Sequence, residues 1–130
     1  MVKKQILVIG GGFAGVKCAE TLRKKLKRHE ADVVLFNSEN YMVFQPLLAE
    51  VVGASISPEP VAVSLRQMLP GVYCRTEDIT KVHLDKSCVE FVDDLGHMGS
   101  MYYDHLVLAC GSDVNLSMVA GMGDHSFPPK

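Results

Sequence analysis

A cluster of glycines between an apolar run and a helical pattern most strongly constrains what this chain can fold into. Ile6–Ile9 is an uninterrupted apolar segment, rich in β-branched residues, that predicts a buried parallel strand. Three adjacent glycines follow, and apolar residues then recur at the spacing of an amphipathic helix that reaches about Arg28. The helical positions are Val16, Ala19, Leu22 and Leu26. Ala31–Phe36 predicts a second strand, so the first part of the chain has the order of a βαβ unit.

The glycines within this unit match the pattern G-x-G-x-x-G that binds the diphosphate of a dinucleotide. Gly10 is expected to form the tight turn, Gly12 to let a diphosphate approach the backbone, and Gly15 to let the helix pack on the strand. The first helical turn would offer N–H groups and a partial positive charge to the phosphates. An acidic residue usually follows the second strand and binds the ribose, but here Asn37 occupies that place and Glu39 lies two residues later.

The same apolar segment could be taken for a membrane span or a secretion signal. Residues 6–16 contain no charge and follow Lys3 and Lys4. The segment is shorter than the roughly 18 apolar residues of a spanning helix. Each glycine would also destabilise a signal helix by up to ~1 kcal/mol relative to alanine. Both alternatives are therefore disfavoured.

Charge and composition indicate a globular domain and argue against nucleic-acid binding. Hydrophobic residues make up 48% of the chain and charged residues 22%, with a net charge of -2. Such a composition is ordinary for a folded protein and unlike that of a disordered one. The basic block at 23–28 contains no aromatic residue and falls at the end of the predicted helix, where cations complement the helix dipole.

The cysteines and histidines do not suggest a metal or catalytic centre. The four cysteines lie far apart without a C-x-x-C pair, so we expect reduced, buried thiols and a reducing, cytoplasmic compartment. The five histidines form no cluster with the spacing of metal ligands. The sequence predicts no metal site, and no residue stands out as a general acid or base.

The remainder of the chain favours a flavin-type domain over an ordinary NAD-binding one. We expect a loop and a short apolar helix over 41–53, and a second helix over 57–69 that stops at Pro70. The segment 72–103 is rich in strand-forming residues and predicts an antiparallel meander before an apolar strand at Leu106–Ala109. The meander is expected to turn at 85–87 and at 96–100. A single NAD-binding Rossmann domain would instead place a helix within 72–103.

Several segments together resemble a known family. "VIGGGFAG", "NYMVFQPLLAEVVG", "SPEPVAVSLRQML" and "YDHLVLACGS" are similar to the N-terminal FAD-binding portion of the pyridine nucleotide-disulfide oxidoreductase superfamily. The similarity is greatest to its type II NADH dehydrogenase and sulfide:quinone oxidoreductase branch. The resemblance implies a three-layer α/β, Rossmann-like FAD/NAD(P)-binding domain with a parallel sheet and an antiparallel β-meander. In the last segment Cys110 replaces the threonine of the family's A-T-G sequence.

The same resemblance implies which residues hold the FAD. The glycine turn would surround the diphosphate, the end of the second strand would face the ribose, and the meander would offer backbone groups to the adenine. A loop residue and the following proline would lie near the flavin ring, and the A-C-G segment would close over the cofactor. The implied residues are Gly10, Gly12, Phe13, Ala14, Gly15, Asn37, Ser38, Gln45, Pro46, Asp78, Ile79, Ala109, Cys110 and Gly111.

The resemblance also implies a function for the whole protein. Residues 1–130 would form its FAD-binding domain, an N-terminal fragment that is inactive alone. The full-length protein would pass electrons from NAD(P)H through FAD to an acceptor such as a quinone, with peripheral contact to the cytoplasmic face of the membrane. Three alternatives stay open: a sulfide:quinone oxidoreductase fragment, a single NAD-binding Rossmann domain, and a non-catalytic module that self-associates.

Overall fold

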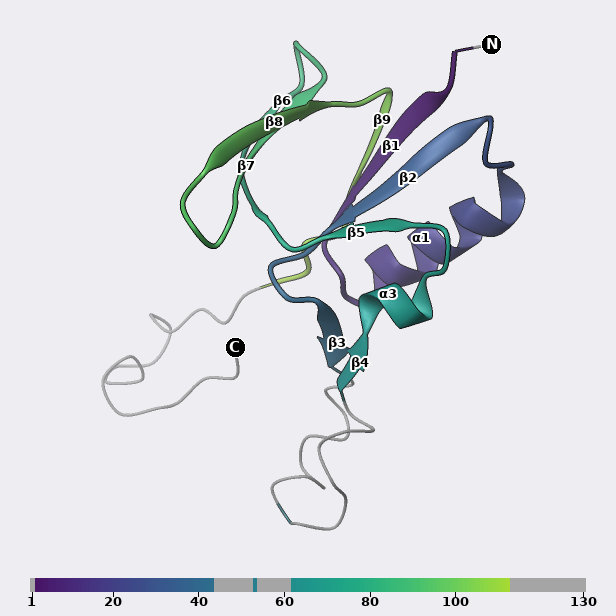
Figure 1. Cartoon of the computed structure of the whole chain (residues 1–130), viewed down its shortest axis with the longest axis vertical. Helices are drawn as coiled ribbons and strands as arrows, with labels where there is room; N and C mark the ends of the chain where they lie inside the picture. Colours follow the sequence, from purple (N-terminus) through teal and green to yellow (C-terminus); the bar gives the residue numbers. More distant parts are fainter. Residues whose placement is uncertain (1, 44–52, 54–61, 113–130) are drawn as a thin grey trace.

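The computed structural model describes residues 2–43, 53 and 62–112, and it has three layers (Figure 1). A parallel sheet forms the middle layer, with the meander on one face and the helices on the other. The elements are β1 (Lys4–Ile9), α1 (Phe13–Lys25), β2 (Ala31–Phe36), β3 (Tyr41–Val43), β4 (Ala62–Ser64), α3 (Leu65–Met68), β5 (Tyr73–Arg75), β6 (Asp78–His83), β7 (Cys88–Val92), β8 (Met98–Tyr102) and β9 (His105–Leu108).

The middle sheet has the strand order β5-β2-β1-β9, and all of its pairs are parallel. Strand β1 lies between β2 and β9, with Ile6 opposite Val33 on one side and His105 on the other. The carboxyl ends of the parallel strands therefore meet at one edge, where open α/β sheets bind their ligands. This arrangement confirms the predicted fold class and the first two strands.

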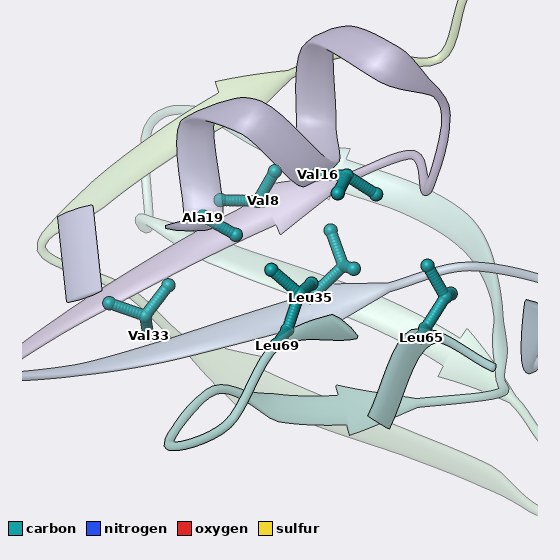
Figure 2. Close-up of a cluster of buried hydrophobic side chains, with 7 residues drawn as sticks. All are labelled: Val8, Val16, Ala19, Val33, Leu35, Leu65 and Leu69. Atoms are coloured by element: carbon teal, nitrogen blue, oxygen red, sulfur yellow. The ribbon is translucent and has the colours of Figure 1, made fainter. Parts of the chain in front are cut away.

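The face of the sheet that α1 covers holds one of two hydrophobic clusters (Figure 2). Side chains from the central strands point toward α1 and toward the α3 region. The buried members are Val8, Val16, Ala19, Val33, Leu35, Leu65 and Leu69. Burying a side chain of the size of Leu35 contributes about 1.5–3 kcal/mol, so this cluster fixes α1 on the sheet.

The opposite face of the sheet packs on the antiparallel strands β6, β7 and β8. Val89 and Phe91 of β7 are buried against Leu7, Val34 and Phe36 of the sheet. The rings of Phe36 and Phe91 lie 5.4 Å apart. This meander confirms the prediction for residues 78–102 and contradicts the helix that a single NAD-binding domain would place there. The prediction is wrong at Tyr73–Arg75, which pairs parallel with β2 and extends the middle sheet.

Helix α1 ends at Lys25, three residues before the predicted end. Leu26 has extended backbone angles, and a turn follows in which Glu30 accepts a hydrogen bond from the Lys27 backbone N–H at 2.6 Å. Arg23 closes the helix end by donating to the Ala31 carbonyl at 3.2 Å and to the Leu26 carbonyl. The early end returns the chain to the start of β2.

Two further predictions need correction, and one lies outside the described residues. The helix predicted over 57–69 is wrong at Ala62–Ser64, which forms a strand because it pairs antiparallel with Tyr41–Val43, and only Leu65–Met68 is helical. The turn predicted at 96–100 lies earlier, because Asp93 Oδ1 accepts the backbone N–H groups of residues 95 and 97 at 2.9 and 2.8 Å. The apolar helix expected within 41–53 falls mostly in segments that the structure does not describe.

Candidate functional site

The glycine turn after β1 has the geometry expected of a diphosphate-binding turn. Gly10 has a φ of 109°, and a Cβ there would lie 2.1 Å from the Ala109 carbonyl oxygen. A Cβ on Gly15 would lie 1.8 Å from the Gly10 carbonyl oxygen, so only glycine permits this approach of α1 to the turn. A Cβ on Gly12 would meet no atom within 4 Å. The middle glycine thus faces open space, while the other two make close backbone contacts.

The first turn of α1 suits an anion. Gly12 is the N-cap residue, no side chain caps the helix, and the first turn contains no acidic residue. The positive end of the helix dipole is therefore not offset by a carboxylate within that turn. Gly12, Phe13 and Ala14 are all exposed at this end.

A cavity of about 220 Å³ lies where the parallel strands end. It brings together six of the predicted site residues, from four separate parts of the chain. These are Gly10, Asn37, Ser38, Asp78, Ile79 and Cys110. Ile9, Phe36 and Glu77 complete the lining.

The Asn37 side chain is already hydrogen-bonded within the protein. Its Oδ1 accepts the Gly11 backbone N–H at 2.9 Å, and its Nδ2 donates to the Glu39 carbonyl at 2.8 Å. One Nδ2 hydrogen is left for a ligand, because an amide nitrogen has two donors. Asn37 therefore joins the glycine turn to the end of β2. It offers the cavity a hydrogen-bond donor at the position where the dinucleotide-binding pattern usually has an acidic side chain, which is an acceptor.

Glu77 is the site residue that sequence reasoning missed. Glu77 lies in the cavity lining. Its carboxylate accepts hydrogen bonds from two nitrogens of Arg75, from Nη2 at 2.6 Å and from Nε at 3.0 Å. Arg75 also lies over the rings of Phe91 and Phe36, with its guanidinium carbon 4.6 and 5.4 Å from their centres. Glu77 directly precedes the predicted site residues Asp78 and Ile79, and this position in the sequence could have identified it as a candidate.

The A-C-G segment follows β9 and lies against the glycine turn. The Ala109 backbone N–H donates to the Ile9 carbonyl at 2.8 Å, and its carbonyl packs on Gly10. Gly111 has a φ of 71° and is exposed. The Cys110 thiol lies 3.8 Å from the Ile9 carbonyl.

The predicted burial of the cysteines is wrong for Cys110, which is exposed at the cavity. Cys88 is buried, whereas Cys18 and Cys74 are only partly exposed. All four thiols are free. Burial raises the pKa of the Cys74 thiol above its usual value, which lowers its reactivity at neutral pH.

Two of the predicted site residues have no described position in the structure. Gln45 and Pro46 lie outside the described residues. Within 2–43, 53 and 62–112, no group of three or more histidine, cysteine, aspartate or glutamate side chains could hold a metal ion. In the same part of the chain, no helix is long and apolar enough to cross a membrane.

The layered fold and the glycine turn define a Rossmann-like dinucleotide-binding domain of the flavoprotein type. A family model described as pyridine nucleotide-disulphide oxidoreductase matches residues 4–128. The chain belongs to this family, which confirms the resemblance seen in its motifs.

Curated relatives are type II NADH:quinone oxidoreductases. The Mycobacterium tuberculosis protein Ndh is 33% identical over 113 residues, which cover 85% of this chain and 23% of that protein. The Staphylococcus aureus type II NADH:quinone oxidoreductase is 28% identical over 127 residues, covering 96% of this chain and 30% of the relative. The chain thus spans about a quarter of the length of these relatives.

Solved structures of related proteins have the same fold. NDH2 from Plasmodium falciparum, determined in complex with NADH, superposes with a TM-score of 0.82 at 22% identity, over 96% of this chain and 26% of that one. The sulfide:quinone oxidoreductase of Aquifex aeolicus superposes with a TM-score of 0.80 at 25% identity, over 95% of this chain and 28% of its own.

Proposed function

We propose that residues 1–130 form the FAD-binding domain of an oxidoreductase that transfers electrons from NAD(P)H to a quinone. The observation that carries the proposal is the open space at Gly12, next to an uncapped helix start and a cavity at the strand ends. The names of the relatives support the donor and the acceptor. Cytoplasmic location, with peripheral membrane contact by the whole protein, belongs to the same proposal.

The residues of this chain would divide the binding of FAD among them. Gly12 and the first turn of α1 would hold the diphosphate, since backbone N–H groups and the helix dipole favour negative charge there. The remaining Nδ2 hydrogen of Asn37 and the carboxylate of Glu77 would serve as donor and acceptor for ribose hydroxyls. Asp78 and Ile79 would bind the adenine through backbone groups.

The other end of the cofactor would be held by the segment after β9 and by the loop after β3. Ala109, Cys110 and Gly111 would close over the FAD, while Gln45 and Pro46 would lie near its ring system. When bound, the flavin accepts a hydride from reduced nicotinamide and passes the electrons to the acceptor. We assign no catalytic acid or base among the side chains, whose role is to bind the cofactor and to exclude water.

Titration of the purified chain with FAD, followed by the absorbance and fluorescence of the flavin, tests the proposal. We expect saturable binding, and a chain that fails to bind added FAD would overturn it. Thiol labelling locates the site, because Cys110 is the exposed cysteine and lines the cavity. Bound FAD should slow the alkylation of Cys110, and Cys110→Ser should remove the fast-reacting thiol. Saturable FAD binding without protection of Cys110 would place the cofactor elsewhere.

The similarity to the Aquifex aeolicus structure supports sulfide as a second candidate donor, with quinone as the shared acceptor. Anaerobic addition of NADH or of sulfide to the FAD-loaded full-length protein distinguishes the two. Bleaching of the flavin band by NADH alone supports the first donor, and bleaching by sulfide alone supports the second.

A further inference from the structure

A second cavity, of about 310 Å³, lies at the opposite end of the sheet from the glycine turn. Its lining comes from the start of β1, the end of α1, the start of β2 and the segment between α3 and β5. These are Lys3, Arg23, Arg28, Asp32, Gly71, Val72 and Tyr73. The six residues of β1 separate it from the glycine turn, a distance of roughly 20 Å. In Figure 1 this end of the sheet lies near the C-terminal end of α1.

The charges around this cavity do not balance. It contains three cationic side chains and one carboxylate, and the Asp32 carboxylate pairs with Lys3 Nζ at 2.6 Å. The hydrogen bonds of Arg23 go to the neutral carbonyl oxygens of Ala31 and Leu26, which fix its position but leave its charge uncompensated. Arg28 makes no hydrogen bond or ion pair with any residue in the described part of the chain.

Both arginine side chains pack on the same point of the backbone. A Cβ on Gly71 would lie 3.2 Å from Arg23 Cδ and 3.5 Å from Arg28 Nη2. Two like charges held on one backbone position repel each other unless a shared counterion lies between them. The α3–β5 segment therefore lies against both arginine side chains at the cavity.

We propose that this cavity binds a phosphate-type oxyanion, independently of the FAD site. The planar guanidinium groups of Arg23 and Arg28 suit tetrahedral oxyanions, to which arginine donates paired hydrogen bonds. Lys3 adds a third positive charge, and Tyr73, which is 60% exposed, supplies a hydroxyl donor at the rim. The open, partly solvated position of the site implies weak binding that added salt weakens further.

Nuclear magnetic resonance of the labelled chain, titrated with inorganic phosphate at constant ionic strength, tests the site directly. We expect the backbone signals of Gly71 and Val72 to shift saturably. Arg28→Gln removes a cation that makes no hydrogen bond or ion pair within the described residues, and it should weaken phosphate binding at least tenfold. Lys25→Gln changes the net charge equally at the same end of α1, but Lys25 does not line the cavity, so this variant should bind within twofold of the parent.

Two results would overturn the proposal: Gly71 signals that do not saturate in the parent chain, or equal weakening by Arg28→Gln and Lys25→Gln. The FAD titration is independent of this measurement, so either proposal can fail alone.

A soluble phosphate monoester and a lipid headgroup present the same oxygens, so glycerol 3-phosphate and vesicles of phosphatidylglycerol in phosphatidylcholine serve as further probes. Loss of vesicle binding in Arg28→Gln, but not in Lys25→Gln, would identify the headgroup as the source. Loss of glycerol 3-phosphate binding alone would identify the soluble ligand.

Discussion

Replacing Gly15 with alanine tests whether close packing of α1 on the glycine turn holds the site together. The added Cβ would lie 1.8 Å from the Gly10 carbonyl oxygen, well inside an ordinary separation of about 3.5 Å, so the helix would have to move by roughly 1.5–2 Å. Overpacking of this kind costs about 1–3 kcal/mol. The movement would also loosen the contacts of Val16 and Ala19 in the cluster under α1.

Alanine favours a helix over glycine by up to about 1 kcal/mol, which offsets part of this cost. We therefore expect Gly15→Ala to lower the free energy of unfolding by about 1–2 kcal/mol and the Tm by roughly 3–10 °C. Urea and thermal unfolding followed by circular dichroism measure both quantities.

Gly12→Ala is the matched control for that substitution. Gly12 has a φ of −77°, which alanine adopts without strain, and a Cβ there meets no protein atom within 4 Å. Its unfolding free energy should change by less than about 1 kcal/mol. The added methyl group would occupy the space where the diphosphate is proposed to lie, so FAD affinity should fall. If Gly15→Ala unfolds like the parent chain, or if Gly12→Ala is the less stable variant, the assignment of these two glycines is refuted.

Two further predictions concern the edges of the sheet and the second hydrophobic cluster. A hydrogen bond from the Gln5 backbone N–H, together with Lys4, lowers the pKa of Asp104 below its usual value. The stabilisation by Asp104 is therefore complete above about pH 4 and is lost as the pH falls through the lowered folded-state pKa. Thermal unfolding from pH 7 to pH 2 should show Asp104→Asn less stable than the parent at neutral pH, with a difference that shrinks in acid. A constant difference would contradict this. Phe91→Ala should lower the free energy of unfolding by about 3–5 kcal/mol, because it removes the ring that packs on Phe36 and lies beneath the Arg75 guanidinium. Chemical denaturation should show this variant to be far less stable than Leu84→Ala, which changes an exposed residue.

The sequence was sufficient to predict the parts of the fold that depend on local pattern. Ile6–Ile9 and Val33–Phe36 are apolar on both faces, and glycine is required at Gly10 and Gly15 by contacts that the fingerprint encodes. The meander was predictable because its segments are rich in strand-forming residues, such as Val89 and Phe91 around Glu90, and are separated by polar turns.

Features that depend on distant partners could not be predicted from local pattern. The sequence around Ala62–Ser64 predicts a helix, but these residues form a strand because they pair with Tyr41–Val43. The end of α1 depends on the turn closed by Glu30. For the site, residue types alone could not indicate that the Asn37 amide is held by Gly11 and Glu39, or that Arg75 holds Glu77 at the cavity.

The central place of β1 has a consequence for how this domain is made. Ile6 pairs with Val33, which follows soon after it, but also with His105, about one hundred residues later. A ribosome adds about 5–20 residues each second, so the earliest strand waits several seconds for its second neighbour. The carbonyl of Ala109 that packs on Gly10 arrives later still, so a nascent chain acquires its complete phosphate-binding turn only near the end of translation of this segment.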